Sequence, residues 1–295
     1  MSVYLLNIGV FICIYGILAL TLNVLIGYAG VFTLAHAAFF GIGAYVATFV
    51  AMNLSASLVV VLIASVLTAG ILSLIIALPA LRVRDEYFVV ISLAIQILCV
   101  TVFSEWKSFT GGLGGIVNIP LPEVFFGTIS TPMEFFLLAL GCMAVITVII
   151  GLVVRGSFGR SLMAVRDNES AALALGKNVA RIKTLAAALS SGLAAVAGVV
   201  YAYYLSFINV QSFTLDTSVL VMAMVIIGGT GTMFGPIVGA ALLTMLPNAL
   251  SYVPFLPPTE IGSIQQILYG LAMILMMIFR PGGIVGRSRS KRDEK

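Results

Sequence analysis

A polar segment at residues 155–183, RGSFGRSLMAVRDNESAALALGKNVARIK, holds the residue types and spacing most suited to a binding role. It gathers six of the fifteen Lys and Arg residues of a chain that is 61% hydrophobic and 9% charged. Asp167 and Asn168 are good helix N-caps, and Gly176 is a favourable C-cap. The segment therefore predicts a short helix over about 159–166 and a second one in ESAALAL, joined by a tight turn.

Two roles fit this segment. Alanines at 171, 172 and 174 leave room for a partner protein to dock closely. Alternatively, the basic residues keep a simple loop on the cytoplasmic side, where it touches anionic lipid. The positive-inside rule requires only basic residues, and it does not require helix caps, small residues or a defined helix end. The pattern therefore favours a docking element.

The remaining sequence shows no residue set for enzymatic chemistry. No nucleophile, base and acid stand at matching spacing, and we expect no catalytic residue and no metal site. Cys13, Cys99 and Cys142 lie in apolar runs without CxxC spacing and are expected to behave as small hydrophobes. The chain contains no GxxxxGK[ST] loop, since its Gly-Lys pair is followed by Asn178. If ATP drives this protein, another polypeptide must bind it.

The elements that position these residues are predicted membrane helices. The mean hydropathy is +1.18, and several apolar runs reach the roughly 20 residues that cross a bilayer core. These runs are continuous, which excludes the alternation of a β-barrel and the polar faces of soluble helices. We predict an all-α polytopic membrane protein with a single transmembrane domain, residues 1–295, and about nine spans (range about 8–10). The expected spans are 3–26, 34–53, 57–80, 87–104, 133–154, 182–204, 218–230, 233–252 and 264–279.

Two of these spans are expected to be irregular. The seventh is short and ends in IIGGTGTMFGP. Backbone freed by Gly or Pro at membrane depth must be buried in protein or line a wet cavity, so this span is predicted to be broken or re-entrant. Gly41 and Gly43 stand in the middle of the second span and predict irregular backbone there as well.

The distribution of basic residues predicts the orientation. Every Lys and Arg except Lys107 lies in the loops at 82–86 and 155–183 or in the tail 280–295. By the positive-inside rule these segments are cytoplasmic, which places the N-terminus outside and the C-terminus inside. On this assignment no Asp, Glu, Lys or Arg lies inside a span, which weakens the case for an ion-coupled carrier.

Several residues within the spans are candidates for a translocation path. His36, the single histidine, is either a hydrogen-bonded structural residue or a polar lining group, and it has no partner for base catalysis. Asn23 and Gln96 form either interhelical hydrogen bonds, the favoured reading, or pore contacts. The glycines of the seventh and eighth spans either open backbone groups toward a zwitterionic solute or pack helices tightly, as Gly-xxx-Gly pairs do. These glycines are Gly228, Gly229, Gly231 and Gly235.

The outer loop at 105–132 is rich in glycine and holds the single tryptophan, Trp106. It is predicted to be extracytoplasmic, and Trp106 is expected at the membrane interface. The loop serves either as a dock or gate for a binding protein or as a flexible connector.

Several stretches together resemble a known family. ALGKNVARIKTLAAALSSGLAAVAGVVYA resembles the cytoplasmic signature of ABC-importer permeases, specifically the branched-chain amino acid permease family of LivM type. Other stretches are similar to the same family in the same order: LNVLIGYAGVFTLAHAAFFGIGAY, LPALRVRDEYFVVISLAIQIL, TGGLGGIVNIP, VMAMVIIGGTGTMFGPIVGAALLTMLP and YGLAMILMMIFRPGGIVG.

The resemblance implies a permease subunit of the cytoplasmic (inner) membrane. Such a subunit pairs with a second, homologous permease, receives solute from an extracytoplasmic binding protein, and is driven by two cytoplasmic ATPase subunits that bind ATP and Mg. It has no cofactor of its own and is not an enzyme. The resemblance assigns to the ATPase-coupling loop Arg160, Ala164, Arg166, Glu169, Ala171, Ala172 and Gly176.

The coupling pattern of importers is Glu-Ala-Ala, three residues, then Gly. Ala171-Ala172 and Gly176 keep this spacing, while Ser170 occupies the Glu position and Glu169 lies one residue earlier. The implied solute is a branched-chain or other hydrophobic amino acid. The alternatives are a permease of the same architecture for urea, an amide or a nucleoside, a self-sufficient carrier or channel, and a membrane scaffold without transport.

Overall fold

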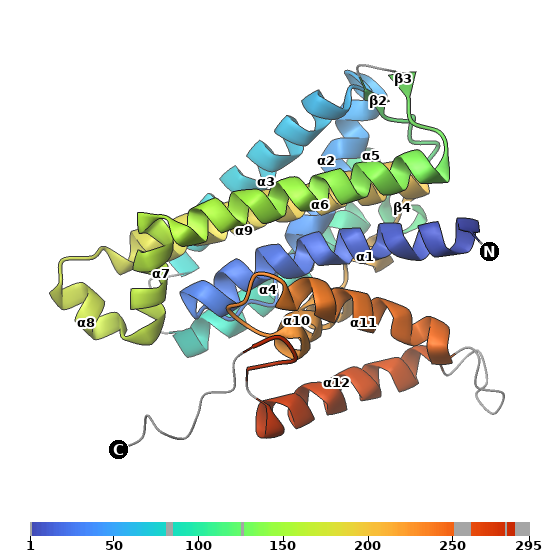
Figure 1. The fold of residues 1–295 in the computed structure, drawn as a ribbon. Coiled ribbons are helices and arrows are strands. Elements are labelled where there is room, and N and C mark those ends of the chain that lie inside the picture. The colour runs from blue at the N-terminus through green and yellow to red at the C-terminus, as the bar shows by residue number, and fades with distance from the viewer. Residues whose placement is uncertain (1, 81–84, 125–126, 251–260, 281, 287–295) are drawn as a thin grey trace.

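The structure is a computed structural model that describes residues 2–80, 85–124, 127–250, 261–280 and 282–286 (Figure 1). Over these residues the fold is a helical bundle with short strands. The helices are α1 Ser2–Asn23, η1 Val24–Ala29, α2 His36–Asn53, α3 Leu58–Ala80, α4 Asp85–Glu105, α5 Lys107–Thr110, η2 Gly112–Gly114, α6 Pro132–Arg155, α7 Ser157–Asp167, α8 Glu169–Ala174, α9 Val179–Leu205, η3 Val210–Phe213, α10 Leu215–Gly228, α11 Gly235–Leu250 and α12 Ile261–Phe279. The strands are β1 Ile116–Val117, β2 Glu123–Val124, β3 Gly127–Thr128 and β4 Phe207–Ile208.

Each of the nine predicted spans corresponds to a helix, but the helices differ in length. Six among the described residues are long and apolar enough to cross a membrane: α1 with η1, α2, α3, α4, α6 and α9. The last three, α10, α11 and α12, are shorter apolar helices. A helix such as α10, with 14 residues, rises only about 21 Å against a hydrocarbon core of roughly 30 Å. The all-α prediction is confirmed, and the seventh span is a short helix ending at glycine, as expected.

The centre of the bundle is built on small residues. Gly198 allows α9 to pack closely along α2, because a Cβ at this position would strike the backbone at Phe40 and Ala44. Gly43 of α2 in turn lies against Ala195 of α9. The prediction of irregular backbone around Gly41 and Gly43 is wrong, since α2 is one continuous α-helix from His36 to Asn53. These glycines serve close helix packing.

The irregular backbone lies instead between α1 and α2. Helix α1 widens into the π-helix η1, which ends at Gly30 in the left-handed conformation (φ 72°). The chain then turns back, and α2 starts at His36, whose Nε2 lies 3.0 Å from Oγ1 of Thr21. Because Thr21 precedes Ala29 by about two helical turns, α2 begins well inside the length of the first helix. The backbone is therefore irregular before α2 begins, and not within α2, where the glycines had suggested it.

The loop at 105–132 is folded onto the bundle end where β2 and β3 lie, opposite α8 (Figure 1). Strand β1 pairs with β4, and β2 pairs with β3 in a hairpin. Ile119 is buried, and Trp106 is half exposed with its ring centroid 5.1 Å from that of Phe109. The described parts of this loop are thus paired with each other and with β4, and its role stays a prediction.

Candidate functional site

The docking segment predicted from sequence is a hairpin of α7 and α8 that projects from one end of the bundle (Figure 1). Asn168 caps α8, accepting a hydrogen bond from Ala171 N at 2.9 Å. Gly176 adopts a left-handed φ of 77° directly after α8, which favours glycine. Asn178 caps α9 in the same way, accepting from Arg181 N at 3.0 Å. The predicted pair of short helices is confirmed, with α7 one to two residues longer at each end.

The hairpin has a small core of its own. Val165 of α7, Ala172 of α8 and Val179 of α9 are buried against one another. Glu169 pairs with Lys183 of α9 at 2.8 Å, and the Lys183 side chain is only 6% exposed. Ala172 is therefore buried inside the hairpin, whereas Glu169 remains 45% exposed and is tied to α9 by its ion pair with Lys183. Lys183 is buried beneath the hairpin and forms no part of its exposed surface.

The outward face of the hairpin is apolar in a way that the sequence motif did not single out. Leu173 and Leu175 are 54% and 80% exposed, and Ala171 and Ala174 beside them are exposed as well. Arg160 and Ala164 on α7 are also exposed. Leu173 and Leu175 on the second short helix were the available signal, because exposed apolar side chains in one place mark an interaction surface.

Arg166 turns inward toward the membrane helices. Its Nη1 donates to the carbonyl of Gly27 in η1 at 2.7 Å, and its Nη2 donates to Asp167 at 2.8 Å. The aliphatic part of its side chain covers Gly30, where a Cβ would lie 2.8 Å from Cγ of Arg166. Arg166 thus joins the hairpin to the end of the first membrane helix, and its role in the coupling loop stays a prediction.

Gly27 belongs to a contact between η1 and the α10–α11 loop. Asn23 donates through Nδ2 to the Thr232 carbonyl at 2.8 Å and accepts from Gly231 N at 2.9 Å. Gly27 has no room for a Cβ, because Gly231 N and Asn23 Oδ1 occupy that space. Gly231 itself has a φ of 72°. We call this contact of Asn23, Gly27, Gly231 and Thr232, together with Arg166, the glycine junction.

A third segment closes the glycine junction. The N–H of Ile284 donates to the Ile227 carbonyl at 2.9 Å, and that of Val285 to the Gly228 carbonyl at 3.1 Å. These bonds satisfy carbonyls at the end of α10 that would otherwise lack partners. Gly229 has a φ of 127° and lies against this segment. The motifs IIGGTG and PGGIVG, far apart in sequence, thus meet in the fold.

Gly228 and Gly235 have the geometry of tight packing. A Cβ on Gly228 would strike the Gly235 carbonyl, and one on Gly239 would strike the Met224 carbonyl. Helices α10 and α11 thus approach through the Gly-xxx-Gly pair. Gly229 and Gly231 serve turns with positive φ. Exposure of the backbone of these glycines to a solute remains a prediction.

Gln96 joins three elements at the start of α2. Its Oε1 accepts from Ala38 N at 2.9 Å and its Nε2 donates to the Phe213 carbonyl at 2.7 Å. Ser218 of α10 accepts from Ala37 N at 2.9 Å. The first N–H groups of a helix lack partners within it, so these side chains satisfy a helix start buried inside the bundle. Gln96 thus joins α4 to α2 and η3, whereas Asn23 joins the end of α1 to the α10–α11 loop.

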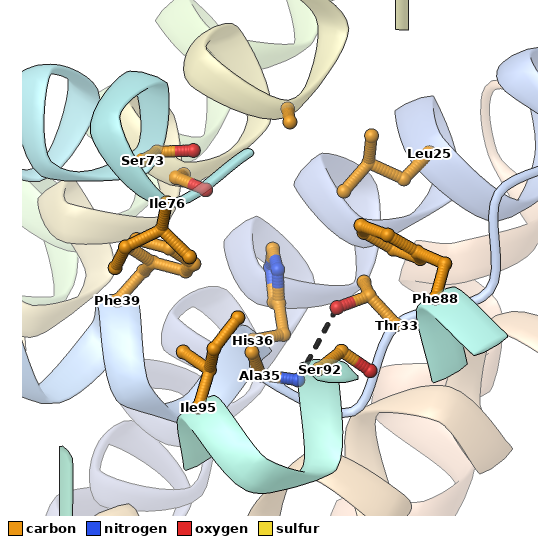
Figure 2. Close-up of a pocket in the computed structure, with 12 residues that line it drawn as sticks. Leu25, Thr33, Ala35, His36, Phe39, Ser73, Ile76, Phe88, Ser92 and Ile95 are labelled. Carbon is orange, nitrogen blue, oxygen red and sulfur yellow. Dashed lines mark hydrogen bonds between the residues drawn. The ribbon is translucent and has the colours of Figure 1, made fainter. Parts of the chain in front are cut away.

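His36 lies at the wall of a small cavity of about 30 Å³, shown in Figure 2. The side chains of Thr33, Ser92 and Phe88 lie on its other sides, and Thr33 accepts from Ala35 N at 3.2 Å. His36 is buried and bonded to Thr21. A cavity of this volume holds a water molecule or so, whereas binding pockets for small molecules measure roughly 300–1,000 Å³. In this structure His36 joins α2 to α1 through Thr21, and the space beside it is too small for a solute; a place for His36 in the translocation path stays a prediction.

Asp216 belongs to a helix, where the sequence placed an outer loop ahead of the seventh span. It sits in the first turn of α10 and lines a larger cavity together with Tyr15, near the middle of α1. The sequence placed Asp216 in an outer loop, because the α10 helix was expected to start later. Other charged residues that were predicted to lie outside the spans include Arg82, Arg84 and those of 287–295, and these lie outside the described residues.

The comparisons with known proteins agree with this geometry. The family model described as "Branched-chain amino acid transport system / permease component" matches residues 4–277. The chain is 29% identical to the high-affinity branched-chain amino acid transport system permease protein LivM of Salmonella typhimurium, over 96% of this chain and 70% of the relative. It is 26% identical to the probable branched-chain amino acid transport permease protein LivM of Methanocaldococcus jannaschii, over 92% and 90%.

A more partial similarity extends to another permease. The chain is 32% identical to the autoinducer 2 import system permease protein LsrC of Yersinia pseudotuberculosis, over 42% of this chain and 37% of the relative. No solved structure matches the chain.

Proposed function

The chain belongs to the branched-chain amino acid transport permease family, and we propose that it is one of two permease subunits of an ATP-driven importer for branched-chain or other hydrophobic amino acids. Members of this family are ABC transport permeases and not enzymes. The observation that carries the proposal is the α7–α8 hairpin, which presents exposed leucines outward and is bonded through Arg166 to the first membrane helix.

The proposed assembly has four kinds of partner. A second, homologous permease completes the membrane part, two ATPase subunits bind ATP and Mg in the cytoplasm, an extracytoplasmic binding protein delivers the solute, and lipid surrounds the spans. The basic residues of the hairpin support a cytoplasmic position for it, with the N-terminus outside and the protein in the inner membrane. The folded loop at 105–132 lies at the opposite end and is the proposed contact for the binding protein.

Force from the ATPases would enter through the hairpin. Closure of two ATP-bound subunits moves whatever is docked on Leu173 and Leu175. The hairpin core and the Glu169–Lys183 pair make α8 and the start of α9 move together. Arg166 then transmits the movement to η1, and Asn23 passes it to the α10–α11 loop. Rigid movement of helices around a central path is how such transporters alternate access.

The identity of the transported solute is a separate part of the proposal. Similarity to LivM proteins favours a branched-chain amino acid. Similarity over 130 residues to a permease of autoinducer 2 import supports the second candidate, another small solute on the same architecture.

Affinity purification from the native membrane in mild detergent, followed by mass spectrometry, tests the assembly. We expect recovery of ATP-binding subunits and a second permease. Uptake of radiolabelled leucine, isoleucine and valine into proteoliposomes containing the purified complex, binding protein and internal ATP then tests the solute. Recovery of the chain alone, with uptake under an ion gradient and without ATP, would instead identify a self-sufficient carrier.

A further inference from the structure

A cavity of about 690 Å³ lies between α1, α10, α11 and α12. It is separate from the small cavity at His36, and its volume lies within the roughly 300–1,000 Å³ of small-molecule sites. Tyr15 contributes to its wall. At 1.5 Å per residue, Tyr15 is about 20 Å from either end of the helix formed by α1 and η1. The cavity therefore reaches the middle of the bundle along the predicted membrane normal.

The cavity wall has a polar part that lipid would not favour. The residues that form it are Asp216 and Thr217 of α10 and Ser263, Gln265 and Gln266 of α12. A carboxylate at this depth is costly unless it faces a wet or occupied cavity, and such residues mark solute or ion pathways. An acyl chain would leave this carboxylate and these amides without partners.

The opposite part of the wall is apolar. Leu220 and Met224 of α10 and Leu243 of α11 line the same cavity. Within about two turns of α10, the residues that line the cavity thus change from the carboxylate of Asp216 to aliphatic and thioether side chains. One end suits a cation with hydrogen-bond donors, and the other suits a branched aliphatic group.

We propose that this cavity is a transit site for the transported amino acid. The Asp216 carboxylate receives the ammonium group, the amides of Gln265 and Gln266 face the carboxylate of the solute, and Leu220, Met224 and Leu243 contact its aliphatic side chain. This proposal rests on the proposed function and adds the site and the charged group that selects the solute.

Asp216 also has a simpler role, since an acidic residue in the first turn stabilises a helix through its dipole. That role needs neither a cavity of this volume nor facing amides. It predicts that changes at Asp216 alter stability alone, so the test requires a readout of charge inside the cavity.

The first measurement uses Gln266→Cys in the purified complex. Its modification rate is compared for a cationic methanethiosulfonate reagent bearing trimethylammonium and an anionic one bearing sulfonate. We expect the cationic reagent to react roughly tenfold faster or more, because a cleft of one charge sign concentrates the opposite sign. Asp216→Asn in the same background should remove this preference. Equal rates for both reagents, or a preference that survives Asp216→Asn, would overturn the proposal.

Two controls belong to this measurement. The parent protein keeps Cys13, Cys99 and Cys142 and sets the background. Ile267→Cys, one position further along α12 and 68% exposed, faces away from the cavity, since Ile267 is absent from its described lining. We expect slow reaction with both reagents at that position.

The second measurement is ATP-driven leucine uptake by the complete importer in proteoliposomes. Asp216→Asn should lower uptake about tenfold, the size of one lost charge-assisted contact, with unchanged copurification of partner subunits and unchanged thermal stability. Asp216→Glu should restore part of it. Glu134→Gln is the matched control, because Glu134 occupies the first turn of α6 far from the cavity and Gln preserves its capping box.

The outcomes separate the two proposals. Wild-type uptake in Asp216→Asn would overturn the transit site while leaving the importer intact. If Asp216→Asn fails to assemble, Gln266→Trp, which fills the cavity from the exposed side of α12, must lower uptake for the proposal to stand. Absence of uptake by the wild-type complex for every amino acid tried would overturn the proposed function, and the reagent preference would still report on the cavity.

Discussion

Leu175 exposes 80% of its apolar side chain at the tip of the hairpin. Burial of one leucine against a partner contributes about 1.5–3 kcal/mol. Leu175→Asp should therefore weaken association with the ATPase subunits roughly tenfold to a hundredfold, since about 1.4 kcal/mol corresponds to a factor of ten. Copurification at increasing salt and detergent, quantified by immunoblotting, measures the effect.

Leu113→Asp is the matched control, because Leu113 is also 80% exposed but lies in η2 at the opposite end of the bundle. It should copurify with the ATPases like the unchanged protein. If Leu175→Asp associates with the ATPase subunits as strongly as the wild-type protein does, the exposed face of the hairpin is not the docking surface. Ala172→Asp is a poor probe of docking, because Ala172 is buried inside the hairpin and the charge would destabilise its core.

Arg166 is expected to affect coupling rather than docking. Arg166→Gln loses the charged bond to the Gly27 carbonyl but leaves the outward face unchanged. We expect normal copurification of the ATPases and a loss of about tenfold in ATP-driven uptake per ATP hydrolysed. Arg181→Gln, an exposed change on the adjacent helix, should leave this ratio unchanged. Parallel loss of association and uptake in Arg166→Gln would indicate a docking role instead.

At the residue scale, sequence patterns predicted backbone conformation better than they predicted which residues each side chain contacts. Asn168 and Gly176 were identified correctly, because caps depend on local backbone geometry. The resemblance assigned Arg166, Glu169 and Ala172 to the coupling loop but did not predict their contacts, which are Gly27, Lys183 and the hairpin core. Those partners become neighbours only when α9 and η1 pack against the hairpin, which no local pattern encodes.

At the scale of elements, the buried start of α2 depends on side chains of two other helices. Gln96→Leu keeps the size of the side chain but removes the bond to the Phe213 carbonyl and the shorter of the two bonds of Ala38 N–H, which keeps only the Ala35 carbonyl at 3.2 Å. Each unsatisfied buried group costs about 1–3 kcal/mol. We expect a clear fall in the thermal unfolding temperature of the purified protein in detergent, measured by tryptophan fluorescence.

Thr101→Val on the same helix is the control for Gln96→Leu. Thr101 is exposed and bonds only within its own helix, to the Ile97 carbonyl at 3.0 Å. Its replacement should change the unfolding temperature little. Equal stability of Gln96→Leu and Thr101→Val would show that the start of α2 is satisfied by other groups.

The helices themselves were largely predictable. Long apolar runs located α1, α2, α3, α4, α6 and α9 within a few residues, because hydrophobic length is the main signal of a membrane helix. The π-helix η1 and the return of the chain to His36 were not predictable, since the contacts beside them are long-range ones, between Thr21 and His36 and between Asn23 and the α10–α11 loop. The start of α10 at Leu215 was missed for the same reason, and Asp216 with it.

At the scale of the whole molecule, the two ends of the bundle should face opposite sides of the membrane. Leu113→Cys is expected to react with a membrane-impermeant maleimide in intact cells, and Leu175→Cys only after permeabilisation. The buried Cys13 and Cys99 limit the background. Labelling of Leu175→Cys in intact cells would reverse the proposed orientation, whose basis is the basic content of the hairpin segment.

The pairing of Ile284 and Val285 with the end of α10 also bears on how the protein is made. Helix α10 enters the membrane before α11 and α12, so for some time its final carbonyls have no partner. They acquire one only when the segment at 282–286 returns to them. A chain in which either intervening helix fails to insert would therefore leave the Ile227 and Gly228 carbonyls without these partners.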